Sequence, residues 1–197
     1  MKPADTYTTI LEAAVTVYGR EGTRGFSMRA VAAEADITAT AIYRHFPDKA
    51  ALARALLERA RRQLGNYLLD GMSGEDSLKR VWSCADSYVR FVRDYPQLYR
   101  LLFMDPLDAA LPDVHELQTG NEATPFRFVA DRIREAMADG FLAAGDPARA
   151  ALSVWAHVHG LCTLALAGRV PLADLQTISV ASLTDLYEGL KRRKADG

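Results

Sequence analysis

Side chains that can contact nucleic acid gather between residues 27 and 49. On the outer side of one short predicted helix lie Thr38, Ala39, Thr40, Tyr43 and Arg44. Small residues near a helix N-terminus let the backbone approach base edges, a threonine methyl can touch the thymine methyl, and an arginine can pair with guanine. This set therefore has the chemistry of a helix that reads the major groove of DNA.

Residues suited to phosphate surround that helix. Ser27, Tyr43, His45 and Lys49 can each give a hydrogen bond or a positive charge to a phosphate oxygen. Such contacts fix the register of a protein on DNA without reading its sequence. Helices that begin after residues 27, 38 and 48 add backbone N–H donors, because helix N-termini bind anions.

The elements that must position these side chains are helices. Apolar residues recur with helical spacing almost everywhere, and no stretch alternates with period two long enough for a strand, which predicts an all-α fold. In the N-terminal part we expect helices over residues 5–18, 28–35, 39–46 and 48–70, with N-caps at Ser27, Thr38 and Asp48. The second and third helices, joined by about three residues, form a helix-turn-helix.

Longer helices are expected in the remainder of the chain. The pattern predicts them over residues 75–94, 96–104, 122–143, 147–167 and 172–193, with Asp146 as an N-cap and one short helix within 105–119. We place the domain boundary after residue 48, so that residues 1–48 form the helix-turn-helix domain and residues 49–197 form a second, helical domain.

Composition limits the class of protein. The 197 residues are 49% apolar, and 24 Lys and Arg face 25 Asp and Glu. The first 62 residues carry 10 basic against 7 acidic side chains, a net +3, and the other 135 carry 14 against 18, a net −4. This balance permits nucleic-acid binding without requiring it. Cys84 and Cys162 are expected to be reduced core thiols of a cytoplasmic protein, and no membrane span is expected.

The segment TATAIYRHFPDKAAL, residues 38–52, resembles the recognition helix and following turn of the TetR family of bacterial transcriptional repressors. The resemblance covers residues 8–57 in detail. It implies a homodimer that binds a palindromic double-stranded DNA operator and is released by a small-molecule inducer. The family usually has Gly at the position of Asp36, and aspartate tolerates the left-handed conformation needed there better than most residues.

Carried over by position, the resemblance gives nine DNA-binding residues. The residues that approach bases are Arg29, Thr38, Ala39 and Thr40. Those that hold phosphates are Ser27, Tyr43, His45 and Lys49. Arg44 reaches either a base or a phosphate. Plainer roles stay open. The N-caps act with or without DNA, Tyr43 could be half-buried, His45 could be an ordinary surface histidine, and Arg29 could be a solvated helix charge.

A second resemblance lies in the C-terminal part. Trp155, His159 and Gly160 are spaced as in a TetR subgroup whose C-terminal domain is named for these residues. By family resemblance the last two long helices make a four-helix bundle with those of a second copy. The inducer pocket is expected among residues that could equally be core: Trp82, Phe91, Tyr95, Tyr99, Phe103, Phe126, Trp155 and His159.

The sequence also bears on functions other than DNA binding. No common catalytic or metal-binding motif occurs, and His157 and His159 lie about 200° apart on a helix, so no catalytic residue, cofactor or metal is expected. Cys162 follows His159 by three residues, a spacing that could activate a thiolate, although an inert core cysteine explains it as well. A helical interaction module without DNA and a helical enzyme remain the alternatives.

Overall fold

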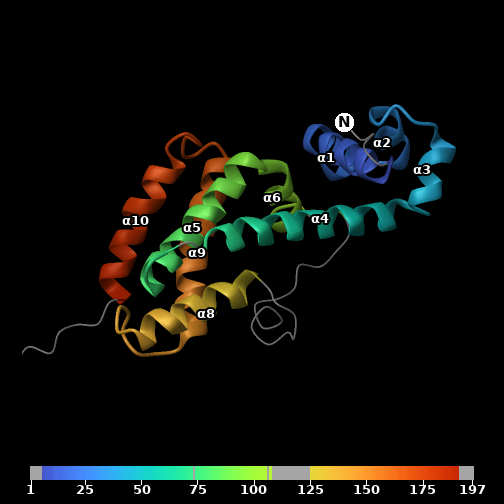
Figure 1. Ribbon diagram of the computed structural model, residues 1–197. Helices are drawn as coiled ribbons and strands as arrows, with labels where there is room; N and C mark the ends of the chain where they lie inside the picture. The colour runs from blue at the N-terminus through green and yellow to red at the C-terminus, as the bar shows by residue number, and fades with distance from the viewer. Residues whose placement is uncertain (1–5, 73, 106, 108–124, 191–197) are drawn as a thin grey trace, which may run out of the picture. The chain divides into compact units, whose positions relative to one another are not determined.

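The computed structural model describes residues 6–72, 74–105, 107 and 125–190. Over these residues the chain is helical and has no strand, as the apolar spacing predicted (Figure 1). The helices divide into two compact units. The first unit holds α1, α2, α3, α4 as far as Gln63, and α6, and the second holds the end of α4 with α5, α8, α9 and α10.

In the first unit α1 (Thr6–Gly25) packs on α2 (Met28–Glu34), which packs on α3 (Ala39–His45). The predicted face of α1, including Ile10, Ala14 and Val17, is buried. The first helix was expected to reach about residue 18 and to end at Gly19 or Gly22; its regular part runs on to Gly22, where φ is 63° and the backbone is not helical, and helical residues resume as far as Gly25. Gly19 is helical, and a Cβ there would lie 2.7 Å from Cγ of Gln97.

The helix α6 (Pro96–Phe103) lies against α1 in this unit. The hydroxyl of Tyr18 donates a hydrogen bond of 2.8 Å to the carbonyl oxygen of Asp105, just after α6. Burial and the nearby Asp105 carboxylate raise the pKa of the Tyr18 hydroxyl well above its ordinary value. Thr23 donates a second hydrogen bond, of 3.2 Å, to the Asp105 carboxylate. These contacts join α6 to the helix-turn-helix unit.

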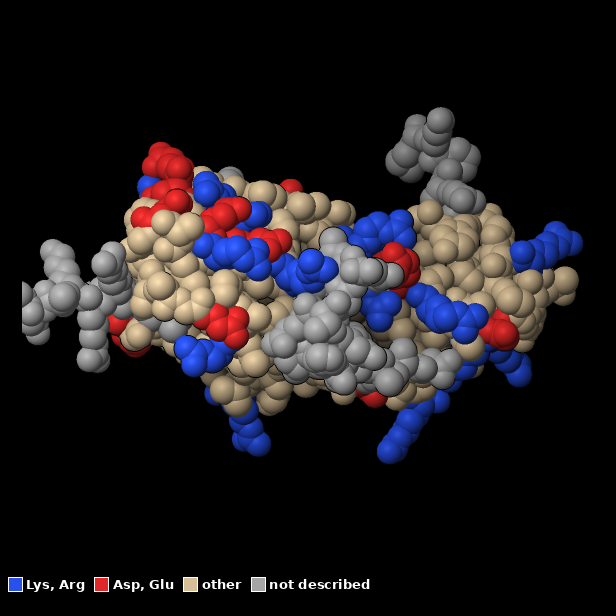
Figure 2. Space-filling view, turned by 90° about the horizontal axis from the view of Figure 1, so that it is seen from below, with Lys and Arg blue, Asp and Glu red and all other residues tan. Residues whose placement is uncertain are grey.

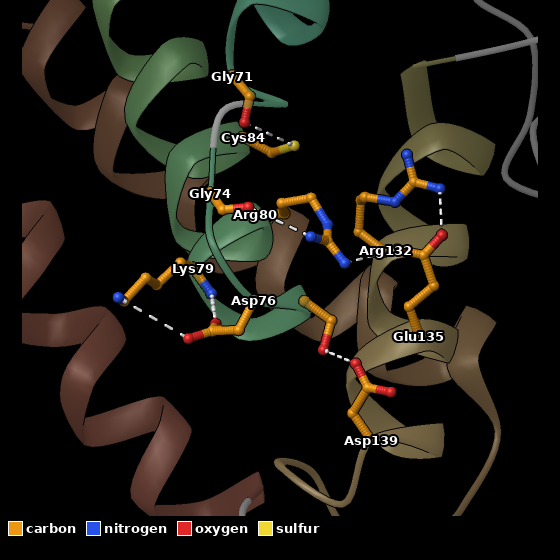
Figure 3. Close-up of polar contacts among 10 residues, drawn as sticks. Gly71, Gly74, Asp76, Lys79, Arg80, Cys84, Arg132, Glu135 and Asp139 are labelled. Carbon is orange, nitrogen blue, oxygen red and sulfur yellow. Dashed lines mark hydrogen bonds and ion pairs between the residues drawn. The ribbon is translucent and has the colours of Figure 1, made fainter.

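In the second unit α5 (Ser77–Asp94) packs against α8 (Pro125–Ala138), and α9 (Pro147–Leu166) packs against α8 and α10 (Leu175–Leu190). Asp146 caps α9 as predicted, accepting a hydrogen bond of 2.9 Å from the Ala148 N–H. Polar contacts join α5 to α8 (Figure 3). Ser77 donates a hydrogen bond of 2.6 Å to Asp139, and Arg80 lies 3.5 Å from Glu135.

The predicted long helices are present with shifted ends. The helix α4 (Lys49–Asp70) and the helix α9 agree with expectation to within one residue. The helix α8 ends before the predicted residue 143, because the chain turns at Gly140, where φ is 80°, and the predicted start at residue 122 lies outside the described residues. The short helix expected within 105–119 lies largely outside the described residues. Among the helices that are described, none combines the length and apolarity needed to cross a membrane.

The predicted boundary between the two functional domains, after residue 48, stays a prediction. The packing groups residues differently, since it keeps the first part of α4 and all of α6 with the helix-turn-helix. Sequence periodicity cannot give this grouping, because α6 is separated from α1 to α3 by two long helices.

Candidate functional site

The turn between α2 and α3 has the geometry that a helix-turn-helix requires. Asp36 has a φ of 53°, in the left-handed region, as expected where the family usually has Gly. The Ile37 N–H donates a hydrogen bond of 3.0 Å to the carbonyl oxygen of Ala32, and the Asp36 N–H donates one of 3.3 Å to that of Ala33. This pair of bonds is a Schellman motif, which ends α2 and redirects the chain into α3.

Side-chain caps begin the three helices around this turn. Ser27 accepts a hydrogen bond of 3.2 Å from the Ala30 N–H, and Thr38 accepts one of 3.2 Å from the Ala41 N–H. Asp48 accepts one of 2.7 Å from the Ala51 N–H at the start of α4. All three predicted N-caps are therefore confirmed, and each fixes where its helix begins.

The large apolar residues that lie between the expected DNA contacts in the sequence are buried. Ile42 is fully buried, Phe46 is 3% exposed and Val31 is fully buried. The ring of Phe46 stacks on that of Tyr7 with centroids 5.0 Å apart. The burial of Ile42 holds α3 in the unit, Ala41 is half-buried, and the other side chains of α3 are exposed.

The nine residues expected to bind DNA are all exposed: Ser27, Arg29, Thr38, Ala39, Thr40, Tyr43, Arg44, His45 and Lys49. The side chain of Tyr43, which the sequence also allowed to be half-buried, is 54% exposed. An exposed aromatic ring of this kind, next to basic side chains, is available to a partner. The structure thus brings the nine together on and beside α3, and their contacts with DNA remain predictions.

Electrostatics favour an anionic partner at this surface. In the part of the chain that the structure describes, the ion pairs do not include Arg29, Arg44 or Lys49. Lys49 has its ammonium 5.9 Å above the buried ring of Phe26. On the face drawn in Figure 2, Lys and Arg predominate among the charged side chains of the first unit, whereas both signs are interspersed over the second.

The residues expected to bind a ligand are divided between the two units. Tyr95, Tyr99 and Phe103 belong to the first unit, where Tyr99 is fully buried and its ring lies 5.1 Å from that of Phe103. Phe91 is a core residue of the second unit, edge-on to Tyr67. Helical spacing could not predict this division, because it shows on which face of its helix a residue lies and not which residues of other helices it contacts.

A second subset gathers around His159. The ring of Trp155 lies 5.3 Å from the imidazole and 6.1 Å from the ring of Phe126. The Tyr88 hydroxyl lies 3.0 Å from Nδ1 of His159. Burial lowers the pKa of His159, so the imidazole is neutral at pH 7. Burial also raises the pKa of the Cys162 thiol to about 12, which keeps it protonated and a poor nucleophile.

The last expected residue, Trp82, lines an apolar pocket of the second unit. The pocket is shallow: of the roughly 370 Å³ between its walls, which includes open solvent, about 30 Å³ is cavity volume, which is room for one water molecule. Residues from α5, α8, α9, α10 and the loop after α8 line it: Leu78, Val81, Trp82, Ala85, Ile133, Leu142, Val154, Leu183, Leu186 and Tyr187. Nine of these were absent from the expected set, since aliphatic residues at helical spacing look the same whether they fill a core or line a pocket.

Comparisons with known proteins agree with this architecture. The family model "Bacterial regulatory proteins, tetR family" matches residues 10–56, and "Tetracyclin repressor-like, C-terminal domain" matches residues 81–187. The HTH-type transcriptional repressor DrrR1 of Streptomyces coeruleorubidus is 40% identical over 65 residues, which are 33% of this chain and 24% of that repressor. The chain thus matches about a quarter of the length of this relative.

Solved structures share the fold over nearly the whole chain. A protein of unknown function from Rhodococcus sp. RHA1 has a TM-score of 0.79 at 25% identity, covering 98% of this chain and all of that one. The transcriptional regulator FadR from Bacillus subtilis, in complex with stearoyl-CoA, has a TM-score of 0.74 at 17% identity, covering 93% and 99%.

The C-terminal match identifies a tetracyclin repressor-like domain, and the narrower likeness to the subgroup named for Trp155, His159 and Gly160 stays a prediction. That match alone spans more than half of the 197 residues, and the N-terminal match coincides with the capped helix-turn-helix. The chain therefore belongs to the TetR family of bacterial regulatory proteins and carries a helix-turn-helix in its N-terminal part.

Proposed function

We propose that the protein is a repressor that binds a palindromic operator as a homodimer and leaves it when a small molecule binds the C-terminal unit. The observation that carries this proposal is that all nine expected DNA-binding residues are exposed, on and around an α3 that is anchored by the buried Ile42. Small residues at the start of α3 suit base edges, and the basic and hydroxyl side chains around it suit phosphates.

Homodimerisation is supported by the surface of the last two helices. Leu164 on α9 is 46% exposed and Val180 on α10 is 50% exposed. Apolar side chains of this size at adjacent helices are suited to a twofold contact, in which the same surface serves both copies. A twofold dimer would present two recognition helices about 34–36 Å apart, which requires a palindromic DNA site.

Release by a ligand needs two conformations that bind DNA unequally. A small molecule shifts their equilibrium only by its differential affinity for the two. The stearoyl-CoA complex of FadR supports the capacity of this fold to hold a small molecule. In this protein the C-terminal unit would bind the inducer and the helix α4, which runs through both units, would carry the change to the DNA-binding helices.

On this proposal the protein acts in the cytoplasm, where its DNA is, and acts by binding rather than by catalysis. The helical interaction module that needs no DNA explains the fold equally well but gives no reason for basic and hydroxyl side chains to surround α3. The helical enzyme has less support, since burial keeps the thiol of Cys162 protonated beside a neutral His159.

Gel-shift titration tests the proposal. The probe is DNA from upstream of the protein's own gene, and a palindromic segment should be retarded at low salt and released steeply as the salt concentration rises. Tyr43→Ala should weaken the complex, whereas Tyr187→Phe, at the other unit, should not alter it. The absence of any retarded complex at low salt would falsify the repressor proposal.

A further inference from the structure

Lys49 occupies the first position of α4, directly after the N-cap Asp48. The N-terminus of a helix carries a partial positive charge, so a cationic side chain is disfavoured there and an acidic one is favoured. Lys49 is exposed, and over the residues that the structure describes no carboxylate forms an ion pair with it. The stability of α4 therefore does not explain a lysine at this position.

The Lys49 ammonium contacts the ring of Phe26 instead. Its Nζ lies 5.9 Å from the ring centroid, within the distance of about 6 Å at which the face of an aromatic ring attracts a cation. Phe26 is 1% exposed, so its ring is fixed in the core of the first unit. Phe26 directly precedes Ser27, the N-cap of α2. The contact thus joins the start of α2 to the start of α4.

An aromatic ring can position an ammonium group without neutralising it. A carboxylate partner would compensate the positive charge and compete with a phosphate, whereas the phenylalanine ring has no net charge. The ammonium has three N–H donors, and because Lys49 is exposed, the donors on the side away from the ring can reach a phosphate. Holding the flexible lysine over the ring also reduces the conformational entropy that it loses on binding.

The backbone that carries Lys49 is fixed independently of Phe26. Phe46, at the end of α3, is 3% exposed and stacks on Tyr7 with ring centroids 5.0 Å apart. The Asp48 carboxylate accepts a hydrogen bond of 2.7 Å from the Ala51 N–H. The turn and the first residues of α4 are thus held by these contacts, and what remains for the Phe26 ring to fix is the side chain of Lys49.

We infer that Phe26 is a positioning residue for DNA binding, whose buried ring holds the Lys49 ammonium where a backbone phosphate contacts it. The inference rests on the proposed function, which makes DNA the partner of Lys49. It adds a buried residue, which itself touches no DNA, to the exposed residues expected to do so. Because Phe26 acts through Lys49, its effect on DNA affinity should vanish when position 49 carries no charge.

A double-mutant cycle on DNA affinity tests this role. Phe26→Leu keeps a large apolar side chain without the ring, and Lys49→Met keeps the length of the side chain without the charge. Phe26→Leu should weaken binding of the palindromic upstream DNA about two- to fivefold, but less than about 1.5-fold when combined with Lys49→Met. Fluorescence anisotropy at one salt concentration measures the four affinities. An equal loss in both backgrounds, or no loss in either, would overturn the inference, because a merely structural ring acts whatever the charge at position 49.

A subtler change guards against a Phe26→Leu protein that does not fold. 3,4,5-Trifluorophenylalanine in place of Phe26 nearly keeps the shape of the ring but removes most of the negative charge from its face, which is what attracts the cation. It should weaken DNA binding in the wild-type background and not in the Lys49→Met background. Unchanged affinity in the wild-type background would overturn the role of the ring face.

Phe128→Leu is the matched control. It also removes a ring from beneath a cation, since the guanidinium carbon of Arg132 lies 5.2 Å from the centroid of Phe128, but it does so in the second unit. DNA affinity should not change in this variant. A loss as large as that in Phe26→Leu would show that loss of packing explains both, and the inference would fail.

NMR of the free protein separates this inference from the repressor proposal. The ring current of Phe26 should shift the ε-methylene protons of Lys49 upfield, and the shift should disappear in Phe26→Leu. If no such shift occurs in the wild type, Phe26 does not hold the ammonium. If the wild type binds the DNA and the cycle shows no coupling, the repressor stands and the role of Phe26 fails. If the shift is present and no DNA is retarded at low salt, the contact stands and the repressor fails.

Discussion

The Tyr88 hydroxyl on α5 lies 3.0 Å from Nδ1 of His159 on α9. This contact joins two helices of the C-terminal unit across 71 positions of sequence. The ring of Trp155, one helical turn before His159, flanks the imidazole at 5.3 Å. The spacing of Trp155 and His159 placed them on one face of a helix, whereas their meeting with Tyr88 depends on how α5 and α9 pack.

The first prediction concerns pH and His159. Burial lowers the pKa of His159 in the folded protein, whereas in the unfolded chain the pKa of this residue is about 6.5. Between these two values only the unfolded state takes up the proton, so the free energy of unfolding should fall as the pH drops below about 6.5. Urea titrations at pH 7.5, 6.5 and 5.5 measure this dependence.

The matched variant is His159→Gln, which removes the titrating group and keeps a hydrogen-bonding side chain. Its free energy of unfolding should be lower than that of the wild type at pH 7.5 and should vary less between pH 7.5 and 5.5. An equally steep pH dependence in the variant would show that other groups cause it.

The second prediction concerns salt. Lys49→Ala should weaken operator binding and reduce the slope of log affinity against log salt concentration by about one, because one phosphate contact is lost. Arg149→Ala removes the same charge from an exposed position of α9 and should leave the slope unchanged. Fluorescence anisotropy over a salt series measures both. A slope that is the same in Lys49→Ala and in the wild type would exclude a phosphate contact by this residue.

The third prediction concerns the left-handed residue of the turn. Asp36 has a φ of 53°, a conformation that costs residues with a Cβ about 1–2 kcal/mol and glycine almost nothing. Asp36→Gly should therefore raise the free energy of unfolding by up to about 1 kcal/mol, and Asp36→Val should lower it by at least about 1 kcal/mol. Thermal unfolding followed by circular dichroism ranks the three proteins. A less stable Asp36→Gly would mean that the carboxylate itself stabilises the turn.

The fourth prediction compares two glycines. A Cβ on Gly71 would lie 2.8 Å from the backbone oxygen of Ser83 and 2.7 Å from Oγ of Ser87, so Gly71→Ala forces α5 to shift. We expect a loss of about 1–3 kcal/mol in the free energy of unfolding. Gly65, inside α4, has nothing within 4 Å of its Cβ position, and Gly65→Ala should add about 0.5–1 kcal/mol. Denaturant titration measures the free energy of unfolding of both variants. If Gly71→Ala leaves that free energy unchanged, Gly71 does not approach Ser83 and Ser87 so closely.

The sequence by itself determined the helices and the helix-turn-helix. Ser27, Thr38 and Asp48 fix where helices begin through bonds to N–H groups three residues away, and the apolar spacing of Val31 and Ile42 fixes the faces that are buried. These are local interactions, so their residues are close in sequence and the pattern predicts them. The exposure of the expected DNA-binding residues follows from the same spacing.

Tertiary structure alone decided which distant residues meet. It placed Tyr99 with the helix-turn-helix unit, Phe126 with Trp155, and Trp82 in a pocket with Leu183 and other aliphatic residues. The physical reason is that the hydrophobic effect is non-directional. An apolar face predicts that a helix is covered, but only the packing of all the helices decides which residues cover it.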